Sequence, residues 1–226
     1  MNILCVLATN IEAKGVFDDW TSDDSPICIK NYPFKGYSID ILITGIGVMH
    51  TSCNLSLQLS KKKYNLVINL GIAGSFNNNY SIGAVVEVLQ EINGDLGTEK
   101  SEFFKDLFDM QLMNKNESPY ANGILLNNKT YTDLPKAKGI SVNKIQTDVN
   151  SIAAIQKKYN PDIETMEGVA VFYTCLIHNI PFVEIRAISN MVAPYNKQNW
   201  DIKLALKNLK KEFGVLLEEM KKISTS

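Results

Sequence analysis

The chain has few of the residues that hold metal ions. Its 226 residues include only two histidines and four cysteines. The cysteines are scattered (Cys5, Cys28, Cys53 and Cys175) and form no CxxC pair. Zinc sites need closely spaced His and Cys ligands, so no metal site is expected. Scattered thiols are typical of a reducing compartment, which predicts a cytoplasmic protein.

Long apolar runs and an excess of charge of one sign are also missing. The apolar run at residues 3–8 is too short for a signal peptide, and no stretch approaches the roughly 18 apolar residues of a membrane span. Lys and Arg number 23 and Asp and Glu number 24, for a net charge of −1. This balance lacks the basic footprint of a nucleic-acid-binding protein. Neither a membrane nor a nucleic acid is expected as a partner.

Short apolar runs alternate with helical patterns along the whole chain. Runs typical of buried strands lie at 3–8, 27–29, 39–44, 66–70, 82–89 and 140–145, and helical spacing is found at 10–19, 48–62, 102–110, 149–158 and 198–222. The alternation predicts an α/β fold, with residues 1–226 forming a single three-layer α/β/α domain around a mostly parallel, twisted central sheet. Ligands of such sheets bind at the carboxyl ends of the strands.

A carboxylate follows the first predicted strand, in "ATNIEAKG". Glu12 stands three residues after Thr9. This spacing is typical of a capping box, in which the two side chains satisfy the first N–H groups of a helix. A carboxylate at the mouth of the sheet can also act as a general base. The spacing leaves both interpretations open.

Two glycine-containing turns follow the next strands, "TGIG" at 44–47 and "GIAG" at 71–74. Glycines at such places allow tight turns and close approach of the backbone to a ligand. Neither turn completes a GxGxxG pattern, because His50 stands where the third glycine of the first would be, and Gly74 is followed by Ser75. No dinucleotide or other cofactor is therefore expected.

The stretch "ETMEGVAVFYTCLIHNIPFVEIRAISN", residues 164–190, reads as a helix followed by a strand with polar groups at both ends. Glu167 lies in the first helical turn, where a carboxylate suits the helix dipole. Arg186 lies within the apolar strand and needs a carboxylate partner, since an unpaired buried charge costs several kcal/mol. Glu12, at a neighbouring strand end, is the candidate for that partner.

Several of these motifs together resemble the purine nucleoside phosphorylase and nucleosidase superfamily. "TMEG" at 165–168 and "RAISN" at 186–190 carry the resemblance, supported by Glu12, "TGIG" and "NLGIAGSF", so that it spans nearly the whole chain. The segment 95–127 also resembles that of futalosine hydrolases. The resemblance implies cleavage of an N-glycosidic bond, a small nucleoside and water as the substrates, and a homo-oligomer, a dimer or larger.

The resemblance also implies roles for particular residues. Glu12 would take a proton from the attacking water, with Arg186 orienting it. Glu167 and Met166 would contact the ribose, and Asn190 would hold the purine. The remaining residues implied at the substrate site are Gly74, Ile145, Gln146 and Ser189.

Two departures from the superfamily narrow the expected reaction. Ile72 stands where the phosphorylases keep Ser or Thr, which favours hydrolysis over phosphorolysis. Asn190 stands where adenine-specific nucleosidases have Asp, which favours a 6-oxopurine leaving group. The expected reaction is hydrolysis of futalosine to hypoxanthine and dehypoxanthine futalosine, in menaquinone biosynthesis. The alternatives are a methylthioadenosine/adenosylhomocysteine or aminodeoxyfutalosine nucleosidase, a phosphorylase, and a nucleoside-binding module without activity.

Overall fold

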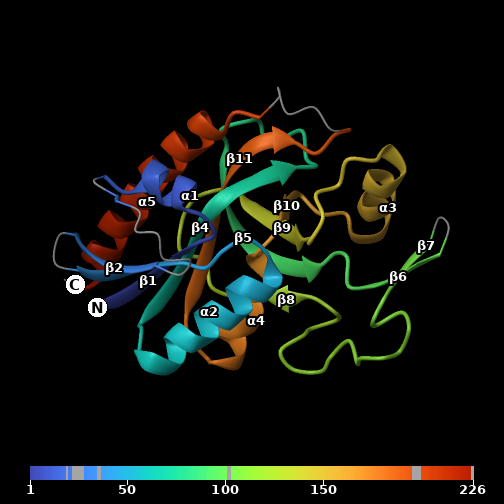
Figure 1. The fold of residues 1–226 in the computed structure, drawn as a ribbon, viewed down its shortest axis with the longest axis horizontal. Coiled ribbons are helices and arrows are strands. Elements are labelled where there is room, and N and C mark those ends of the chain that lie inside the picture. Colours follow the sequence, from blue (N-terminus) through green and yellow to red (C-terminus); the bar gives the residue numbers. More distant parts are fainter. Residues whose placement is uncertain (19, 22–27, 35–36, 101–102, 195–199, 225–226) are drawn as a thin grey trace.

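A computed structural model describes residues 1–18, 20–21, 28–34, 37–100, 103–194 and 200–224 (Figure 1). The helices in this part of the chain are α1 (Asn10–Val16), α2 (Val48–Lys61), α3 (Val149–Tyr159), α4 (Gly168–Ile177) and α5 (Ile202–Ser224). The strands are β1 (Asn2–Leu7), β2 (Cys28–Phe34), β3 (Tyr37–Ile43), β4 (Leu66–Ser75), β5 (Val85–Asn93), β6 (Gly97–Lys100), β7 (Phe103–Asp106), β8 (Leu125–Leu126), β9 (Lys136–Ser141), β10 (Ile163–Thr165) and β11 (Phe182–Met191).

The central sheet has nine of these strands and is mixed, so the prediction of a mostly parallel sheet is corrected. Its order is β10-β9-β5-β11-β4-β1-β3-β2, with β8 paired to β5. Five strand pairings are parallel and four are antiparallel. No helix separates β4 from β5 or β2 from β3. Parallel neighbours need a crossover of a dozen or more residues, so short connections of this kind reverse the strand direction.

One part of the sheet closes on itself. The far end of β4 pairs with β10, at Ser75 and Gly74, although β10 also ends the strand order on the other side. The strands β4, β11, β5, β9 and β10 therefore form a closed ring of pairings. This closure brings β10, which begins at Ile163, beside the carboxyl ends of β4 and β11.

Helices cover both faces of the sheet, as predicted (Figure 1). Helices α1 and α5 pack on one face, where Ile68 and Leu70 of β4 join the core. Helices α2 and α4 pack together on the other, where Val67 and Ala73 of the same strand are buried. Alternate residues of a strand point to opposite faces, which is why a strand that is apolar throughout fits between two helical layers.

The predicted helix at 102–110 is wrong within the described residues. Strands β6 and β7 form a two-stranded hairpin there, and the chain then turns instead of winding into a helix. Asp106 Oδ1 accepts a hydrogen bond from the backbone N–H of Asp109 at 2.8 Å. A short acidic side chain bonded to its own backbone in this way favours a turn over a helix.

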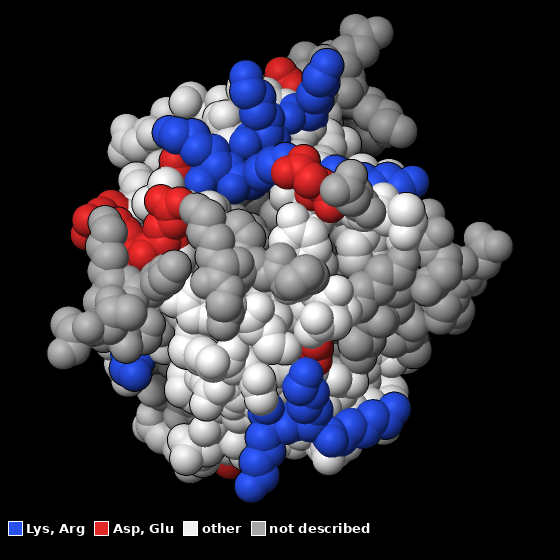
Figure 2. Space-filling view, turned by 90° about the vertical axis from the view of Figure 1, so that its left-hand side faces the viewer, with Lys and Arg blue, Asp and Glu red and all other residues white. Residues whose placement is uncertain are grey.

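The surface charges do not form one continuous basic area on the face in Figure 2. Lys and Arg gather there in two groups, separated by uncharged residues, and Asp and Glu lie beside the upper group. Among the described residues, no helix is both long enough and apolar enough to cross a bilayer.

Candidate active site

A cleft of about 270 Å³ opens at the carboxyl ends of the central strands. Its size is close to the lower end of the range of sites for small ligands. Seven of the nine residues predicted for the site line it: Glu12, Gly74, Ile145, Met166, Glu167, Ser189 and Asn190. Arg186 lies behind this lining and Gln146 lies in an adjoining hollow. The walls are apolar, with Ile72, Trp200 and Ile202 among them.

Glu12 stands at the start of α1 and forms the capping box that its spacing predicts. Its Oε2 accepts hydrogen bonds from the backbone N–H and the hydroxyl of Thr9, both at 3.0 Å. The second oxygen, Oε1, accepts from the backbone N–H of Ile72 at 3.3 Å. Each carboxylate oxygen can accept two hydrogen bonds, so Oε1 keeps room for one more. The cap therefore holds the carboxylate in place at the cleft without using all of its acceptor capacity.

Arg186 is 1% exposed and its hydrogen-bond partner is Glu184, not Glu12 as the sequence analysis expected. The Arg186 Nε donates to Glu184 Oε1 at 2.7 Å, and Nη1 lies 3.7 Å from Glu167 Oε2. Residues two apart on a strand point to the same face, which places Glu184 beside Arg186. The charges of Glu184 and Glu167 raise the pKa of Arg186 further above its usual range, against the effect of burial. Its guanidinium therefore stays charged.

Gly71 gives the guanidinium its space. It is the register partner of Arg186 across β4 and β11. A Cβ at position 71 would lie 2.2 Å from Arg186 Nη1 and 2.9 Å from Glu12 Oε1. No side chain fits at that distance, so the first glycine of "GIAG" is required for Arg186 and Glu12 to approach the same point.

A second buried carboxyl lies next to Glu184. A Cβ at Gly168 would lie 2.3 Å from Glu91 Oε1 and 2.8 Å from Glu184 Oε1, so the two carboxyl groups adjoin the same small space. Burial, and then the charge of Glu184, raise the pKa of Glu91 well above its usual range. Ser141 donates to Glu91 Oε2 at 2.7 Å. The raised pKa favours the neutral form of the Glu91 carboxyl beside Glu184.

Glu167 occupies the N-cap position of α4 and is 7% exposed. Its Oε1 accepts from the backbone N–H of Gly47 at 3.0 Å. Gly47 has φ of +95°, a conformation that L side chains rarely adopt, so this glycine of "TGIG" lets the amide face Glu167. Burial raises the pKa of Glu167, and the nearby Arg186 opposes that rise. The turn and the guanidinium together hold the carboxyl at the cleft, between Met166 and Glu12.

Asn190 is placed by an irregularity in β11. The register between β11 and β4 shifts between Ile188 and Asn190, so that Asn190 pairs with Gly74. Such a bulge re-aims the side chain that follows it. The Asn190 Oδ1 accepts from the hydroxyl of Ser189 at 2.8 Å, while Nδ2 donates to the carbonyl of Met191 at 3.2 Å. One N–H of the amino group is therefore left to donate, and the amide oxygen, with two lone pairs, can accept one further hydrogen bond.

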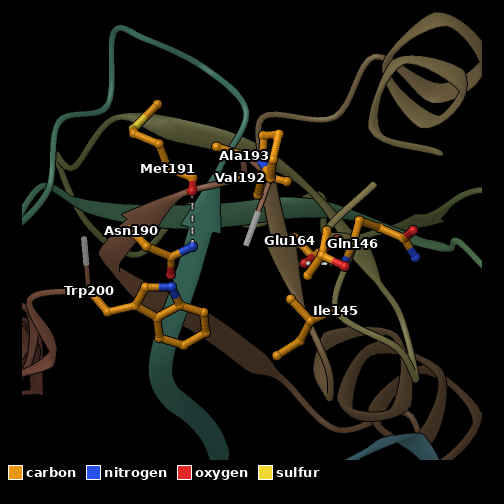
Figure 3. A pocket seen from close by; sticks show the side chains of 10 residues that line it. Ile145, Gln146, Glu164, Asn190, Met191, Val192, Ala193 and Trp200 are labelled. Carbon is orange, nitrogen blue, oxygen red and sulfur yellow. Dashed lines mark hydrogen bonds between the residues drawn. The ribbon is translucent and has the colours of Figure 1, made fainter. Parts of the chain in front are cut away.

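The adjoining hollow lies between Asn190 and the loop that follows β9 (Figure 3). Ile145 and Trp200 line both the hollow and the cleft. The side chain of Gln146 turns back to its own loop, where Nε2 donates to the carbonyl of Lys144 at 2.9 Å. Its backbone N–H instead faces Glu164, at 3.4 Å from Oε1. The backbone of Gln146, and not its side chain, is thus the part that faces Glu164.

Three residues of this region were missed by the sequence analysis: Glu164, Glu184 and Trp200. Glu184 had a signal, because "FVEIR" places it two residues before Arg186. Glu164 stands at the head of the "ETMEG" stretch, which reads in the sequence as the start of a helix, whereas the structure places it in β10. Trp200 has no local signal, since its place depends on how the chain returns from β11 to α5.

Comparisons with known proteins show which sequences and folds this chain resembles. No protein-family model matches the chain. It is 26% identical over 188 residues to a futalosine hydrolase of Thermus thermophilus, covering 82% of this chain and 84% of that protein. It is 27% identical over 172 residues to a 5'-methylthioadenosine/S-adenosylhomocysteine nucleosidase of Maridesulfovibrio salexigens, covering 70% of each. A solved structure of a Helicobacter pylori futalosine hydrolase mutant superposes with a TM-score of 0.78 at 14% identity, over 96% of this chain and 99% of the other.

The fold and the relatives define a class of enzyme. The chain has the α/β fold of the nucleoside phosphorylases, and its relatives hydrolyse N-glycosidic bonds. The protein is similar to nucleosidases of the purine nucleoside phosphorylase and methylthioadenosine nucleosidase superfamily, and futalosine hydrolases are among the proteins that it resembles.

The pair of Glu184 and Arg186 generates a prediction about stability. Glu184→Ala is expected to lower the free energy of unfolding by about 3–5 kcal/mol, because it leaves a buried cation without its partner. Glu184→Gln is expected to cost less, since an amide oxygen can still accept from Nε. Urea denaturation measures both, with the exposed Glu117→Gln as the control. A Glu184→Ala protein as stable as the control would show that Glu184 does not hold Arg186.

Proposed function

We propose that this nucleosidase acts on a 6-oxopurine nucleoside, and that the substrate is futalosine, cleaved to hypoxanthine and dehypoxanthine futalosine in menaquinone biosynthesis. The observation that carries the proposal is the amide of Asn190. Its oxygen accepts from Ser189 and its amino group donates to Met191, which leaves one N–H to donate to a bound base. A fixed donor suits the acceptors N7 and O6 of hypoxanthine. The similarity to futalosine hydrolases over about four fifths of the chain supports the same choice.

Glu12 is proposed as the base that activates water. Cleavage of an N-glycosidic bond passes through a ribosyl cation of oxocarbenium character, much as glycoside hydrolysis does. Water must lose a proton as it attacks, and a carboxylate within hydrogen-bonding reach can take it. The free acceptor position of Glu12 Oε1 suits this role. Arg186 is proposed as a positioning residue, because it adjoins Glu12 at Gly71 and interacts with Glu167.

Glu167 and Met166 are proposed to bind the ribose. A carboxylate that accepts hydrogen bonds from two sugar hydroxyls makes charge-assisted bonds, about twice as strong as neutral ones. Its negative charge also lies where the ribosyl cation would form, which stabilises the transition state more than the substrate. Arg186 opposes the rise in the pKa of Glu167 that burial causes, and so favours the ionised form that this role needs.

Asn190 is proposed to stabilise the departing base. Negative charge grows on hypoxanthine as the bond breaks, and an N–H donor aimed at N7 or O6 lowers the energy of that state. An amide cannot transfer its proton, so the leaving group would gain its proton from water or from another group. Gly74 lets the amide approach, because a Cβ there would lie 3.1 Å from Asn190 Nδ2.

A second candidate is the same hydrolysis on a 6-aminopurine nucleoside. The similarity to 5'-methylthioadenosine/S-adenosylhomocysteine nucleosidases, at 27% identity, favours it. The two candidates share Glu12, Glu167 and Arg186 and differ at the base. Phosphorolysis lacks support from the second glycine turn, where the apolar Ile72 faces the cleft.

A product analysis distinguishes these reactions. The protein is incubated with futalosine, inosine and methylthioadenosine, each with and without phosphate, and the released base and sugar are identified. The proposal expects hypoxanthine and a free sugar from futalosine, without any need for phosphate. Faster release of adenine from methylthioadenosine would overturn the proposed substrate, and a sugar phosphate would overturn hydrolysis.

The role of Glu12 gives the next prediction. Glu12→Gln should keep the fold, because Gln can also complete a capping box, while it removes the base. The expected loss in kcat is about 10²–10⁴-fold. Steady-state kinetics on the substrate identified above measures it, with the melting temperature as the check on folding. A variant that keeps more than about a third of the wild-type kcat would leave Glu12 with the capping role alone.

Asn190 gives a prediction about the choice of base. Asn190→Asp places a second oxygen beside the Met191 carbonyl, in place of the amino group that donates to it. The protonated form of the acid can donate to N7 and accept from a 6-amino group, whereas its ionised form can only accept. The ratio of kcat/KM for futalosine to that for its 6-amino counterpart should fall by at least about tenfold. An unchanged ratio would contradict the role proposed for Asn190.

A further inference from the structure

Glu164 is a buried carboxyl at the cleft that the proposed hydrolysis does not use. It lies in the middle of β10, is 6% exposed, and lines both the cleft and the adjoining hollow. Its Oε1 accepts a long hydrogen bond, 3.4 Å, from the backbone N–H of Gln146. Its Oε2 is buried and has no hydrogen-bond partner among the described residues. Buried polar atoms are almost always paired, so an orphaned carboxylate oxygen at a cleft points to a donor on a ligand.

The sheet places Glu164 and Asn190 on either side of one glycine. Gly74 of β4 pairs with Glu164 of β10 and also with Asn190 of β11. Directly paired residues point to the same face of a sheet, and two strand spacings separate the outer pair by roughly 10 Å. The glycine between them has no side chain. A slot therefore lies between a carboxyl on one side and an amide on the other, and Figure 3 shows the two side chains on opposite sides of the hollow.

We propose that Glu164 accepts a hydrogen bond from N1–H of a 6-oxopurine and thereby selects the base together with Asn190. This inference rests on the proposed function and adds the second contact that determines specificity. Asn190 would bind N7 and O6, and Glu164 would bind N1–H, on the other side of O6. The terminal torsion of a Glu side chain is soft, so either oxygen can turn toward the ring.

The two common purines differ at this position in their hydrogen bonding. Hypoxanthine carries a donor, N1–H, whereas adenine carries an acceptor, the lone pair of N1. An ionised Glu164 therefore attracts hypoxanthine and repels adenine, and a protonated Glu164 can instead donate to adenine N1. A site that leaves buried groups unpaired with the wrong base rejects that base strongly.

The charge state of Glu164 makes the choice depend on pH. Burial, with a contribution from the charge of Asp95, raises the pKa of Glu164 to about 7, against the opposing effect of the Gln146 N–H. The paired residues on the neighbouring strands, Gly74 of β4 and Ile140 of β9, carry no charge. Affinity for hypoxanthine should therefore rise as the pH increases through about 7, and affinity for adenine should fall.

Equilibrium binding of the free bases tests this without any need for turnover. Dissociation constants of hypoxanthine and adenine are measured by calorimetry between about pH 6 and pH 8, on either side of the pKa of Glu164. The wild-type protein should show opposite trends for the two bases. Glu164→Gln should remove both trends, because an amide does not ionise, and Glu117→Gln should keep them. Hypoxanthine affinity that is independent of pH in the wild-type protein would overturn the proposal.

A modified base isolates the single contact. In 1-deazahypoxanthine a C–H replaces N1–H. The wild-type protein should bind it roughly 10- to 100-fold more weakly than hypoxanthine, as expected for loss of a bond to a charged group. Glu164→Ala should bind the two bases about equally, since the partner of N1–H is gone. An equal penalty in both proteins would overturn the proposal and leave Glu164 as a support for the loop at Gln146.

The two proposals fail in different measurements. The proposed function is tested by the products of turnover, whereas the role of Glu164 is tested by the affinity of free bases. Hydrolysis of futalosine combined with equal penalties for the modified base would refute only the role of Glu164. Binding that follows the expected pH trends, without hydrolysis of futalosine, would refute only the substrate.

Discussion

The geometry of the cleft depends on one buried cation, the guanidinium of Arg186. It has almost no contact with water, and a charge in that position is stable only among carboxylates. Glu184 lies on β11, the same strand as Arg186, and Glu167 lies at the start of α4, while Gly71 of β4 leaves the space that the guanidinium fills. Strands β4 and β11 and the start of α4 must therefore meet around one group. Their meeting places Glu167 beside Glu12, so the ion pairs that hold Arg186 also assemble the polar end of the cleft.

Strand β4 explains why both glycines of "GIAG" are needed. Gly71 pairs with Arg186 and Gly74 pairs with Asn190, so three steps along β4 correspond to four along β11. The bulge before Asn190 absorbs the extra residue. Each glycine thus stands opposite a large polar side chain: a Cβ at position 71 would collide with Arg186, and one at position 74 would make a tight contact of 3.1 Å with Asn190 Nδ2. The "GIAG" sequence lies within strand β4. Its two glycines leave space for side chains of the neighbouring strand β11.

Local patterns predict the strand ends but not what meets there. The apolar runs and the capping box of Thr9 and Glu12 depend on neighbouring residues, so the sequence predicts them. The direction of each strand does not depend on its own residues, because an apolar run reads the same in a parallel and an antiparallel pair, and the mixed sheet was missed. The partner of Arg186 was within reach of the sequence, in "FVEIR". The pairing of Glu164 with Gly74 could not be predicted from the sequence, because it results from the closure of the sheet.

The groups proposed for the hydrolysis and those proposed to select the base are separate in this fold. Glu12, Glu167 and Arg186 influence one another through charge, so a change in one alters the others. The pKa of Glu164 responds instead to burial, Gln146 and Asp95. Asn190 is held by its neighbours Ser189 and Met191. Substitutions at Glu164 of β10 and at Asn190 of β11 can therefore change which purine is bound, without disturbing the ion pairs of Arg186.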